Sequence, residues 1–283
     1  MKIIHTLYFF LLSGIVQAQL HLPELSPRSY LKQEVGYTNI TISYGRPATR
    51  GRVVMGEVVP YNTLWRTGAG EGTQISFDRP VTIAGKKIPA GTYAFVTIPD
   101  RDQWTVLLNT DTSKIYGDPA EYDLKFEALR FSVTPQKSSR FYESLTIDLD
   151  ITNYNADLYL SWENTQIHFP ILTHTDEEAL KHIALSLEKN PGNDEMYAAA
   201  AYYYFVNQKD PDQALQFINN ALSIKEDRWY YLQKIDLLIR LKNHSEAIVL
   251  TEKTIEFLRR TKPIEWEHTV KSIEAKRNSW PHK

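Results

Sequence analysis

The spacing of hydrophobic residues divides the chain into two parts. From Val35 to Phe169, hydrophobic and polar residues alternate in short stretches, as in TNITISY at residues 38–44 and TYAFVTI at residues 92–98. Alternation with a period of two predicts strands that bury one face. Further stretches of this kind cover residues 103–109, 129–133, 144–151 and 156–162. Short strands at regular spacing predict an all-β domain, either an antiparallel sandwich or a jelly-roll-like barrel.

Turn-forming residues separate the predicted strands. Ala84-Gly85, Pro89-Ala90-Gly91 and Pro99-Asp100 combine residue types that favour reversal of the chain. We expect Pro89-Ala90-Gly91 to form a hairpin turn that leads into a central strand.

After residue 172 the hydrophobic residues recur at helical spacing, and the first such run ends at Asn190-Pro191-Gly192. Thr175 precedes three acidic residues, which predicts that it is the N-cap of this helix. Proline and glycine directly after a periodic run indicate its end. The sequence therefore predicts an all-α domain over residues 173–283.

The helical part contains an internal repeat. Asp212-Gln213-Ala214-Leu215 aligns with Ser245-Glu246-Ala247-Ile248 at a spacing of 33 residues, and Ala179-Leu180 precedes Ala214-Leu215 by 35. Over residues 173–260 these spacings and the alanine positions resemble tetratricopeptide repeats. The tryptophan and glycine positions of that repeat's first helix are mostly occupied by other residues. A last helix, over residues 265–278, is expected to cap the stack.

The N-terminus has the pattern of a secretory signal peptide. Lys2 precedes an apolar run at residues 7–12, and small residues follow up to Ala18. We expect cleavage near Ala18, and no later stretch approaches the roughly 20 apolar residues that a membrane helix needs. The predicted division is a signal peptide at residues 1–18, a β domain at residues 19–172 and the helical domain. The expected location is periplasmic or secreted.

Composition excludes several classes of function. The chain has no cysteine, which rules out disulfides, thiol catalysis, thiolate metal sites and a lipoprotein anchor. It has 32 Lys and Arg against 34 Asp and Glu, for a net charge of −2. Because no basic excess is present, we expect neither nucleic acid nor an anionic membrane as a partner.

Arginine, glycine and aromatic residues concentrate between residues 43 and 73. Guanidinium groups bind carboxylate or phosphate in a bidentate manner and stack on aromatic rings. This segment therefore predicts a site for a small anionic or sugar ligand. The candidate ligand-binding residues are Arg46, Arg52, Tyr61, Trp65, Arg66 and Glu71. A second interpretation is that the arginines pair with Glu57, Glu71 or Asp78 and brace irregular loops, because structural ion pairs resemble functional sites.

Catalytic patterns are sparse. Most of the eight histidines fall at or beyond the end of the β domain, and none forms a metal-ligating pair such as His-x-His. No Gly-x-Ser-x-Gly sequence is present. We expect no catalytic residue, metal or cofactor from these patterns. Glu57 and Glu71 leave open a glycan-acting hydrolase in which the arginines hold the substrate.

Five elements of the β domain stand in a recognisable order. They are Arg46-Pro47, Gly51-Arg52, Val59-Pro60-Tyr61, Trp65-Arg66-Thr67-Gly68 and Pro89-Ala90-Gly91-Thr92-Tyr93. With these elements, residues 26–169 resemble the exported bacterial family called domain of unknown function 2911. The resemblance implies an exported β domain, often followed by a repeat-like helical tail, and it implies no established reaction.

The leading hypothesis is a non-enzymatic exported protein. Its β domain would bind a small ligand or brace the fold, and its helical repeat would dock on the β domain or bind a protein of the bacterial envelope. The glycan-acting hydrolase and a purely structural assembly role are the alternatives.

Overall fold

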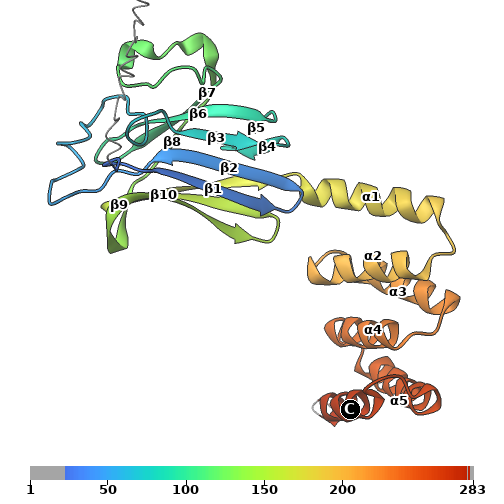
Figure 1. The fold of residues 1–283 in the computed structure, drawn as a ribbon. Helices are drawn as coiled ribbons and strands as arrows, with labels where there is room; N and C mark the ends of the chain where they lie inside the picture. The colour runs from blue at the N-terminus through green and yellow to red at the C-terminus, as the bar shows by residue number, and fades with distance from the viewer. Residues whose placement is uncertain (1–22, 279, 281–283) are drawn as a thin grey trace, which may run out of the picture.

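The computed structural model of the protein describes residues 23–278 and residue 280. In these residues ten β-strands come first and six α-helices follow, so the predicted order of an all-β and an all-α domain is confirmed. The signal peptide predicted for residues 1–18 lies outside the described residues. Figure 1 shows the strands as one body and the helices as a stack that leads away from it.

The first sheet has six antiparallel strands in the spatial order β1-β2-β3-β6-β7-β8. Its strands are β1 (Arg28–Val35), β2 (Thr38–Gly45), β3 (Gln74–Phe77), β6 (Gly91–Ile98), β7 (Trp104–Asn109) and β8 (Glu127–Val133). The sequence did not predict β1. This strand lies at the sheet edge and buries only Val35, so its hydrophobic alternation is weak.

The second sheet has four antiparallel strands in the order β5-β4-β10-β9. Its strands are β4 (Val81–Ile83), β5 (Lys86–Ile88), β9 (Gln136–Thr152) and β10 (Asn155–Thr173). Both sheets contribute to one hydrophobic core, with Phe95 and Trp104 from the first and Leu160 and Trp162 from the second. The β domain is therefore an antiparallel sandwich.

The turn at residues 89–91 differs from the prediction. β5 pairs only with β4, whereas β6 pairs with β3 and β7 in the other sheet. Residues 89–91 consequently carry the chain from one sheet to the other, and the predicted hairpin is wrong. The Tyr93 hydroxyl donates to the Pro89 carbonyl at 2.9 Å and fixes the crossing. Turn chemistry predicts the reversal of the chain but not which strand it pairs with next.

Strand β10 leads almost directly into α1 (Thr175–Lys189), with one residue between them. The N-cap of α1 is His174, so the predicted N-cap Thr175 is instead the first helical residue. Thr175 is buried, and its hydroxyl accepts the Tyr37 N–H at 3.0 Å from the turn between β1 and β2. The hydroxyl thus holds a strand turn against the helix rather than capping its own helix.

Three loops of the sandwich contact the first two helices. Besides the Tyr37 turn, Arg79 forms an ion pair with Glu178 of α1. Tyr154, between β9 and β10, stacks on Tyr203 of α2 (Asp194–Val206) with ring centroids 6.0 Å apart and planes 2° apart. Because the contacts come from separate loops, they fix the direction in which α1 leaves the sandwich (Figure 1).

Side-chain caps define the starts of four helices. Each cap accepts a backbone N–H from the first turn, which satisfies a donor that has no partner within the helix. The capping residues are Asn193 for α2, Asp210 for α3 (Pro211–Ile224), Asp227 for α4 (Arg228–Arg240) and Asn243 for α5 (His244–Thr261). The last helix is α6 (Trp266–Asn278).

Small residues lie where the helices pack. Ala179, Ala214 and Ala247, which the repeat alignment pairs, lie on α1, α3 and α5, and all three are buried. Ala214 packs with Ile218 and Leu237 in one hydrophobic cluster. A methyl side chain lets neighbouring helix backbones approach closely, so these positions set the spacing of the stack.

Candidate functional site

The segment rich in arginine connects β2 to β3, at the end of the sandwich far from α1 (Figure 1). Trp65 attaches the middle of this segment to the first sheet. The backbone N–H of Trp65 donates to the Thr97 carbonyl at 2.7 Å, and the backbone N–H of Thr97 donates to the Trp65 carbonyl at 2.9 Å. Its ring stacks on Trp162 with centroids 5.9 Å apart. Trp65 therefore contributes to the packing between the sheets, and most of its ring is not available to a ligand.

Thr67 holds an unusual backbone conformation in the same loop. Its φ is 57°, a left-handed value that is rare for a β-branched residue, and its side chain is fully buried. The Thr67 hydroxyl lies 3.0 Å from that of Thr97, and the Thr73 hydroxyl donates to the Thr67 carbonyl at 2.8 Å. Such strain persists only where the surrounding contacts over-determine it, so the Trp65–Gly68 turn is held in one shape.

Arg46 and Arg52 brace the backbone. Nε of Arg46 donates to the Leu145 carbonyl at 3.0 Å, and Nε of Arg52 donates to the Thr49 carbonyl at 2.9 Å. Among the described residues neither arginine forms an ion pair, so the expected pairing with Glu57, Glu71 or Asp78 is not found. These two arginines therefore brace the loop, but they do so through backbone carbonyl oxygens and not through carboxylates.

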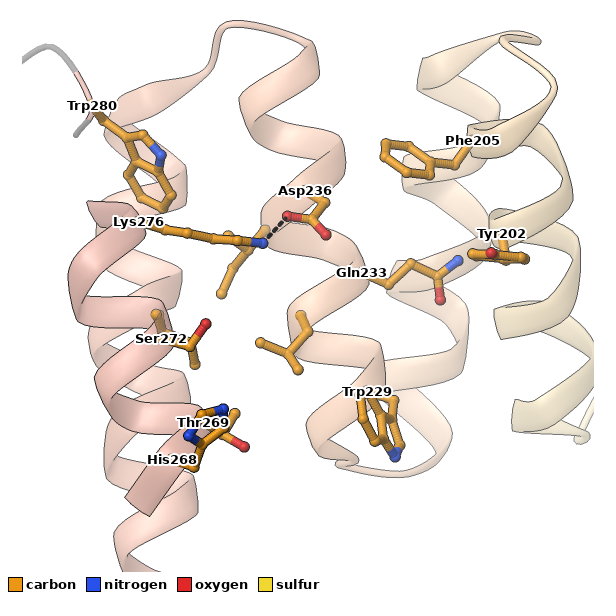
Figure 2. Close-up of a pocket in the computed structure, with 13 residues that line it drawn as sticks. Tyr202, Phe205, Trp229, Gln233, Asp236, His268, Thr269, Ser272, Lys276 and Trp280 are labelled. Carbon is orange, nitrogen blue, oxygen red and sulfur yellow. Dashed lines mark hydrogen bonds and ion pairs between the residues drawn. The ribbon is translucent and has the colours of Figure 1, made fainter. Parts of the chain in front are cut away.

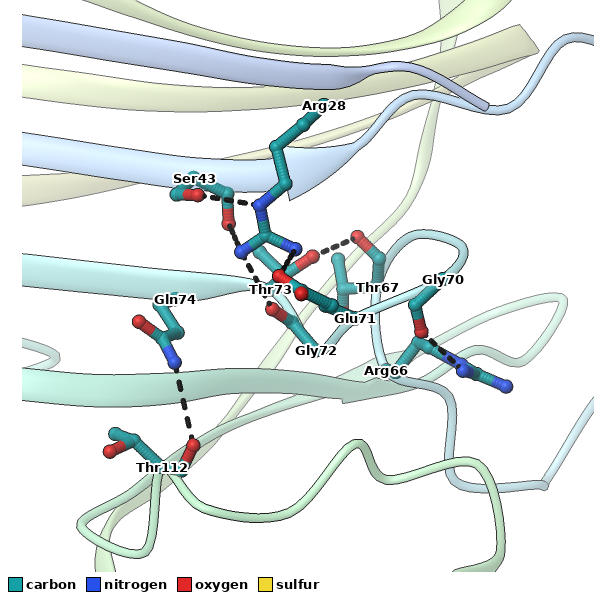
Figure 3. A network of polar contacts seen from close by, with 10 residues as sticks. All are labelled: Arg28, Ser43, Arg66, Thr67, Gly70, Glu71, Gly72, Thr73, Gln74 and Thr112. Atoms are coloured by element: carbon teal, nitrogen blue, oxygen red, sulfur yellow. Dashed lines mark hydrogen bonds and ion pairs between the residues drawn. The ribbon is translucent and has the colours of Figure 1, made fainter. Parts of the chain in front are cut away.

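Glu71 belongs to a polar network centred on Arg28, a residue that the sequence did not single out (Figure 3). Arg28 donates to the Ser43 hydroxyl at 2.8 Å and to the Gly72 carbonyl at 3.2 Å, and it forms an ion pair with Glu71 at 3.1 Å. The Glu71 side chain is 79% exposed, whereas that of Arg28 is only 20% exposed. Arg28 thus fixes the loop to β2, and Glu71 compensates its charge from the surface.

Tyr61 and Arg66 lie in two further hollows. The Arg101 guanidinium lies 5.2 Å from the centre of the Tyr61 ring, beside a hollow of about 230 Å³ that also contains Lys137. Arg66 lines another hollow of about 180 Å³ with Trp65 and Tyr116. The six predicted residues therefore do not form one site, because the structure distributes them over separate parts of the loop.

The helical domain carries a groove on the stack of helices (Figure 2). It has a volume of about 440 Å³ and is lined by side chains of α2, α4 and α6, the alternate helices of the stack, together with Trp280. Trp229 and Tyr202 are its most exposed aromatic residues, with 61% and 59% of their surface accessible. Tyr202 is one of three successive tyrosines whose helical positions require at least one to face away from the core.

Polar side chains lie among the apolar lining of the groove. Lys276 of α6 forms an ion pair with Asp236 of α4 at 3.4 Å, which links the two helices. Nε2 of Gln233 donates to the Ala198 carbonyl of α2 at 3.1 Å, which leaves its amide oxygen as an acceptor. The groove thus combines exposed aromatic rings with hydrogen-bonding groups, a combination suited to a chain that has both apolar side chains and backbone amides.

Residues that line the groove come from positions up to 78 apart in the sequence, from Tyr202 to Trp280. The available signal was the repeat itself, since equivalent first helices of successive repeats face the same side. At the repeat spacing of 33 residues, Trp229 on α4 occupies the position equivalent to Met196 on α2.

Across residues 23–278 no group of three or more His, Asp or Glu side chains has the arrangement of a metal site. Within the same part of the chain, none of the helices combines the length and apolar character that crossing a membrane requires. A family model described as "Protein of unknown function (DUF2911)" matches residues 26–171. No match was found among curated proteins or solved structures.

Proposed function

We propose that this chain, which belongs to the DUF2911 family, is a binding protein whose helical domain holds an extended peptide segment of a partner protein. The family description assigns no activity, so the proposal rests on the geometry of the chain itself. We also propose that the protein is exported, since residues 1–18 have the pattern of a signal peptide.

The observation that carries the proposal is the groove lined by α2, α4 and α6. Helix pairs that repeat every 33 to 35 residues, with buried alanines at matching positions, are similar to tetratricopeptide repeats. In such stacks the first helices of successive pairs line one continuous surface, and extended surfaces of this kind serve for binding.

The exposed aromatic rings favour a peptide as the occupant. Trp229 projects from the first turn of α4 and is 61% exposed, although a large ring gains free energy when it is buried. Aromatic residues of this type are enriched where binding energy concentrates in protein interfaces. An extended peptide supplies apolar side chains for Trp229 and Tyr202, and its backbone amides suit the Gln233 amide oxygen and the Asp236 carboxylate.

Selection from a displayed library of random ten-residue peptides tests the proposal. We expect the full chain, from residue 19 onward, to enrich peptides that share one or two aromatic or large aliphatic residues. Trp229→Ala should lose binding to the enriched peptides by roughly 10- to 100-fold, the effect of removing an interface anchor.

Val249→Ala is the matched control, because Val249 lies on α5, is 66% exposed and does not line the groove. Both changes remove exposed apolar surface, so neither should alter the melting temperature by more than about 2 °C. Equal peptide binding by Trp229→Ala and the wild type, or no enrichment at all, would rule the groove out as the binding site.

A further inference from the structure

Arg66 lies at a hollow in the β domain that differs in chemistry from the helical groove. The hollow has a volume of about 180 Å³ and lies between the β2–β3 connection and the loop that follows β7. Pockets for drug-sized ligands measure about 300–1,000 Å³. A hollow of this size therefore fits a small molecule or the terminal group of a larger one.

Two neighbours, Gly70 and Gly117, limit where the Arg66 guanidinium can lie. Nη1 of Arg66 donates to the Gly70 carbonyl at 2.6 Å, and Figure 3 shows the rest of its guanidinium directed away from the Arg28 network. A Cβ atom at Gly117 would lie 3.1 Å from Nη2 of Arg66, so a larger residue there would require the guanidinium to move by a few tenths of an ångström. Thr67, which follows Arg66, and Tyr116, which precedes Gly117, both have a φ of 57°. Backbone strain of this kind persists only where surrounding contacts over-determine it, so the segments around Arg66 and Gly117 are each held in one shape.

The donors of Arg66 are incompletely used. Gly70 is the one acceptor of its guanidinium within residues 23–278, which leaves Nε and Nη2 without a hydrogen bond there. No Asp or Glu side chain is among the residues that line the hollow. The nearby Glu121 carboxylate accepts the Gly117 N–H at 3.0 Å and lies outside this lining. The positive charge at the hollow is consequently not neutralised from within it.

The lining of the hollow also includes the aliphatic side chains of Val58, Val59, Pro60 and Leu64. Val59 is buried, whereas Val58 is 40% exposed. Inorganic anions gain nothing from apolar walls, but a short aliphatic chain does. The lining thus combines one cationic group, which offers a planar pair of N–H donors, with aliphatic side chains.

From this arrangement we infer that the hollow binds an aliphatic carboxylate. The Nε and Nη2 donors of Arg66 hold the two carboxylate oxygens, since the planar fork of arginine matches a carboxylate in bidentate geometry. A branched chain of three or four carbons lies against Val58, Val59 and Leu64. The carboxylate belongs either to a free short-chain acid or to the C-terminal residue of a peptide.

Isothermal titration calorimetry with isovalerate tests the inference at neutral pH. Isovaleramide has nearly the same shape without the charge, and acetate has the charge without the branched chain. We expect isovalerate to bind most tightly, acetate more weakly and isovaleramide least. N-acetyl-leucine and a tripeptide ending in leucine distinguish the two sources of the carboxylate. Tighter binding of the tripeptide identifies a peptide terminus, and tighter binding of isovalerate identifies a free acid.

Arg66→Gln should weaken isovalerate binding by roughly 10- to 100-fold, since a charged hydrogen-bonding group is lost. Arg52→Gln is the control, because Arg52 belongs to the same loop but, within residues 23–278, donates only to the backbone carbonyls of residues 48 and 49. If Arg66→Gln does not fold, Arg66→Lys provides a second test, because lysine keeps the charge but lacks the planar pair of donors. Equal binding of isovalerate and isovaleramide, no detectable heat, or unchanged binding by both variants would overturn the inference.

Discussion

Replacing Gly36 with alanine should disrupt the contact between the sandwich and helix α1 and lower the stability of the folded chain. Gly36 lies in the turn between β1 and β2 with a φ of +59°, and a Cβ there would lie 2.1 Å from Oγ1 of Thr175 and 2.6 Å from its Cγ2. These distances are far below van der Waals contact, so the turn or the start of α1 has to move. Such a movement also breaks the hydrogen bond from the Tyr37 N–H to the Thr175 hydroxyl.

Three contributions set the size of the effect. The left-handed conformation costs alanine about 1–2 kcal/mol. Over-packing costs about 1–3 kcal/mol, and the lost hydrogen bond about 1 kcal/mol. We therefore expect Gly36→Ala to lower the free energy of unfolding by roughly 3–6 kcal/mol, measured by urea denaturation with far-UV circular dichroism.

Gly85 provides a matched control. It has a φ of +75° in the turn between β4 and β5, and a Cβ there would have no heavy atom within 4 Å. Gly85→Ala carries only the conformational cost, about 1–2 kcal/mol. In the Gly36→Ala background, Thr175→Gly should recover the over-packing part, with a coupling of about 1–3 kcal/mol. Equal losses for the two glycine variants, or no coupling to Thr175, would refute the reasoning.

Two further predictions concern pH. Burial opposes the charge on Asp176, but hydrogen bonds from Lys209 and Tyr203 and the Lys209 charge lower the pKa of Asp176 below 3.8. The ionised carboxylate stabilises the folded chain above pH 3.8, and this stabilisation is lost as the pH falls from 3.8 through the lowered pKa of the folded state. The advantage of the wild type over Asp176→Asn in urea denaturation should therefore disappear over that acidic range. A difference that stays constant from about pH 6 to pH 2 would contradict the role of this ion pair. Burial, with Asp111 and Glu121, raises the pKa of Tyr116 to about 12. Folded protein then keeps this proton longer than the unfolded chain, so stability should decline between about pH 10 and pH 12, and less steeply in Tyr116→Phe. An equal decline of stability with pH in the wild type and Tyr116→Phe would contradict this role of Tyr116.

Local sequence patterns predicted the positions of the strands, the start of α3 and the change from strands to helices. The period-two stretches are strands, because burial of one face requires alternation. The Asp210-Pro211 turn begins α3 with the Asp210 side chain as its cap, as local chemistry requires. In the same way, the change of period after residue 172 locates the change from strands to helices. Each of these features follows from contacts within a few residues.

The sequence did not predict the partners of Trp65, Arg46 and Thr175, because these partners lie far away along the chain. A tryptophan in a loop rich in arginine has the same sequence signature whether its ring stacks on a ligand or on another tryptophan. Trp65 stacks on Trp162, which lies on β10 in the other sheet. Arg46 binds the carbonyl of Leu145, 99 residues away. Thr175 has the local signature of an N-cap, but its hydroxyl accepts a hydrogen bond from Tyr37, 138 residues earlier. The partner of each side chain was set by the packing of the sandwich, which no local pattern encodes.

The junction between β10 and α1 contains one residue, His174, and sandwich loops hold both sides of it. A flexible linker would let its two domains reach partners over a range of separations, at an entropic cost that depends on linker length. This chain has no such slack at the junction, so the helical groove and the Arg66 hollow keep a constant separation. If one partner occupies both the proposed groove and the proposed hollow, its two binding elements must match the distance between them.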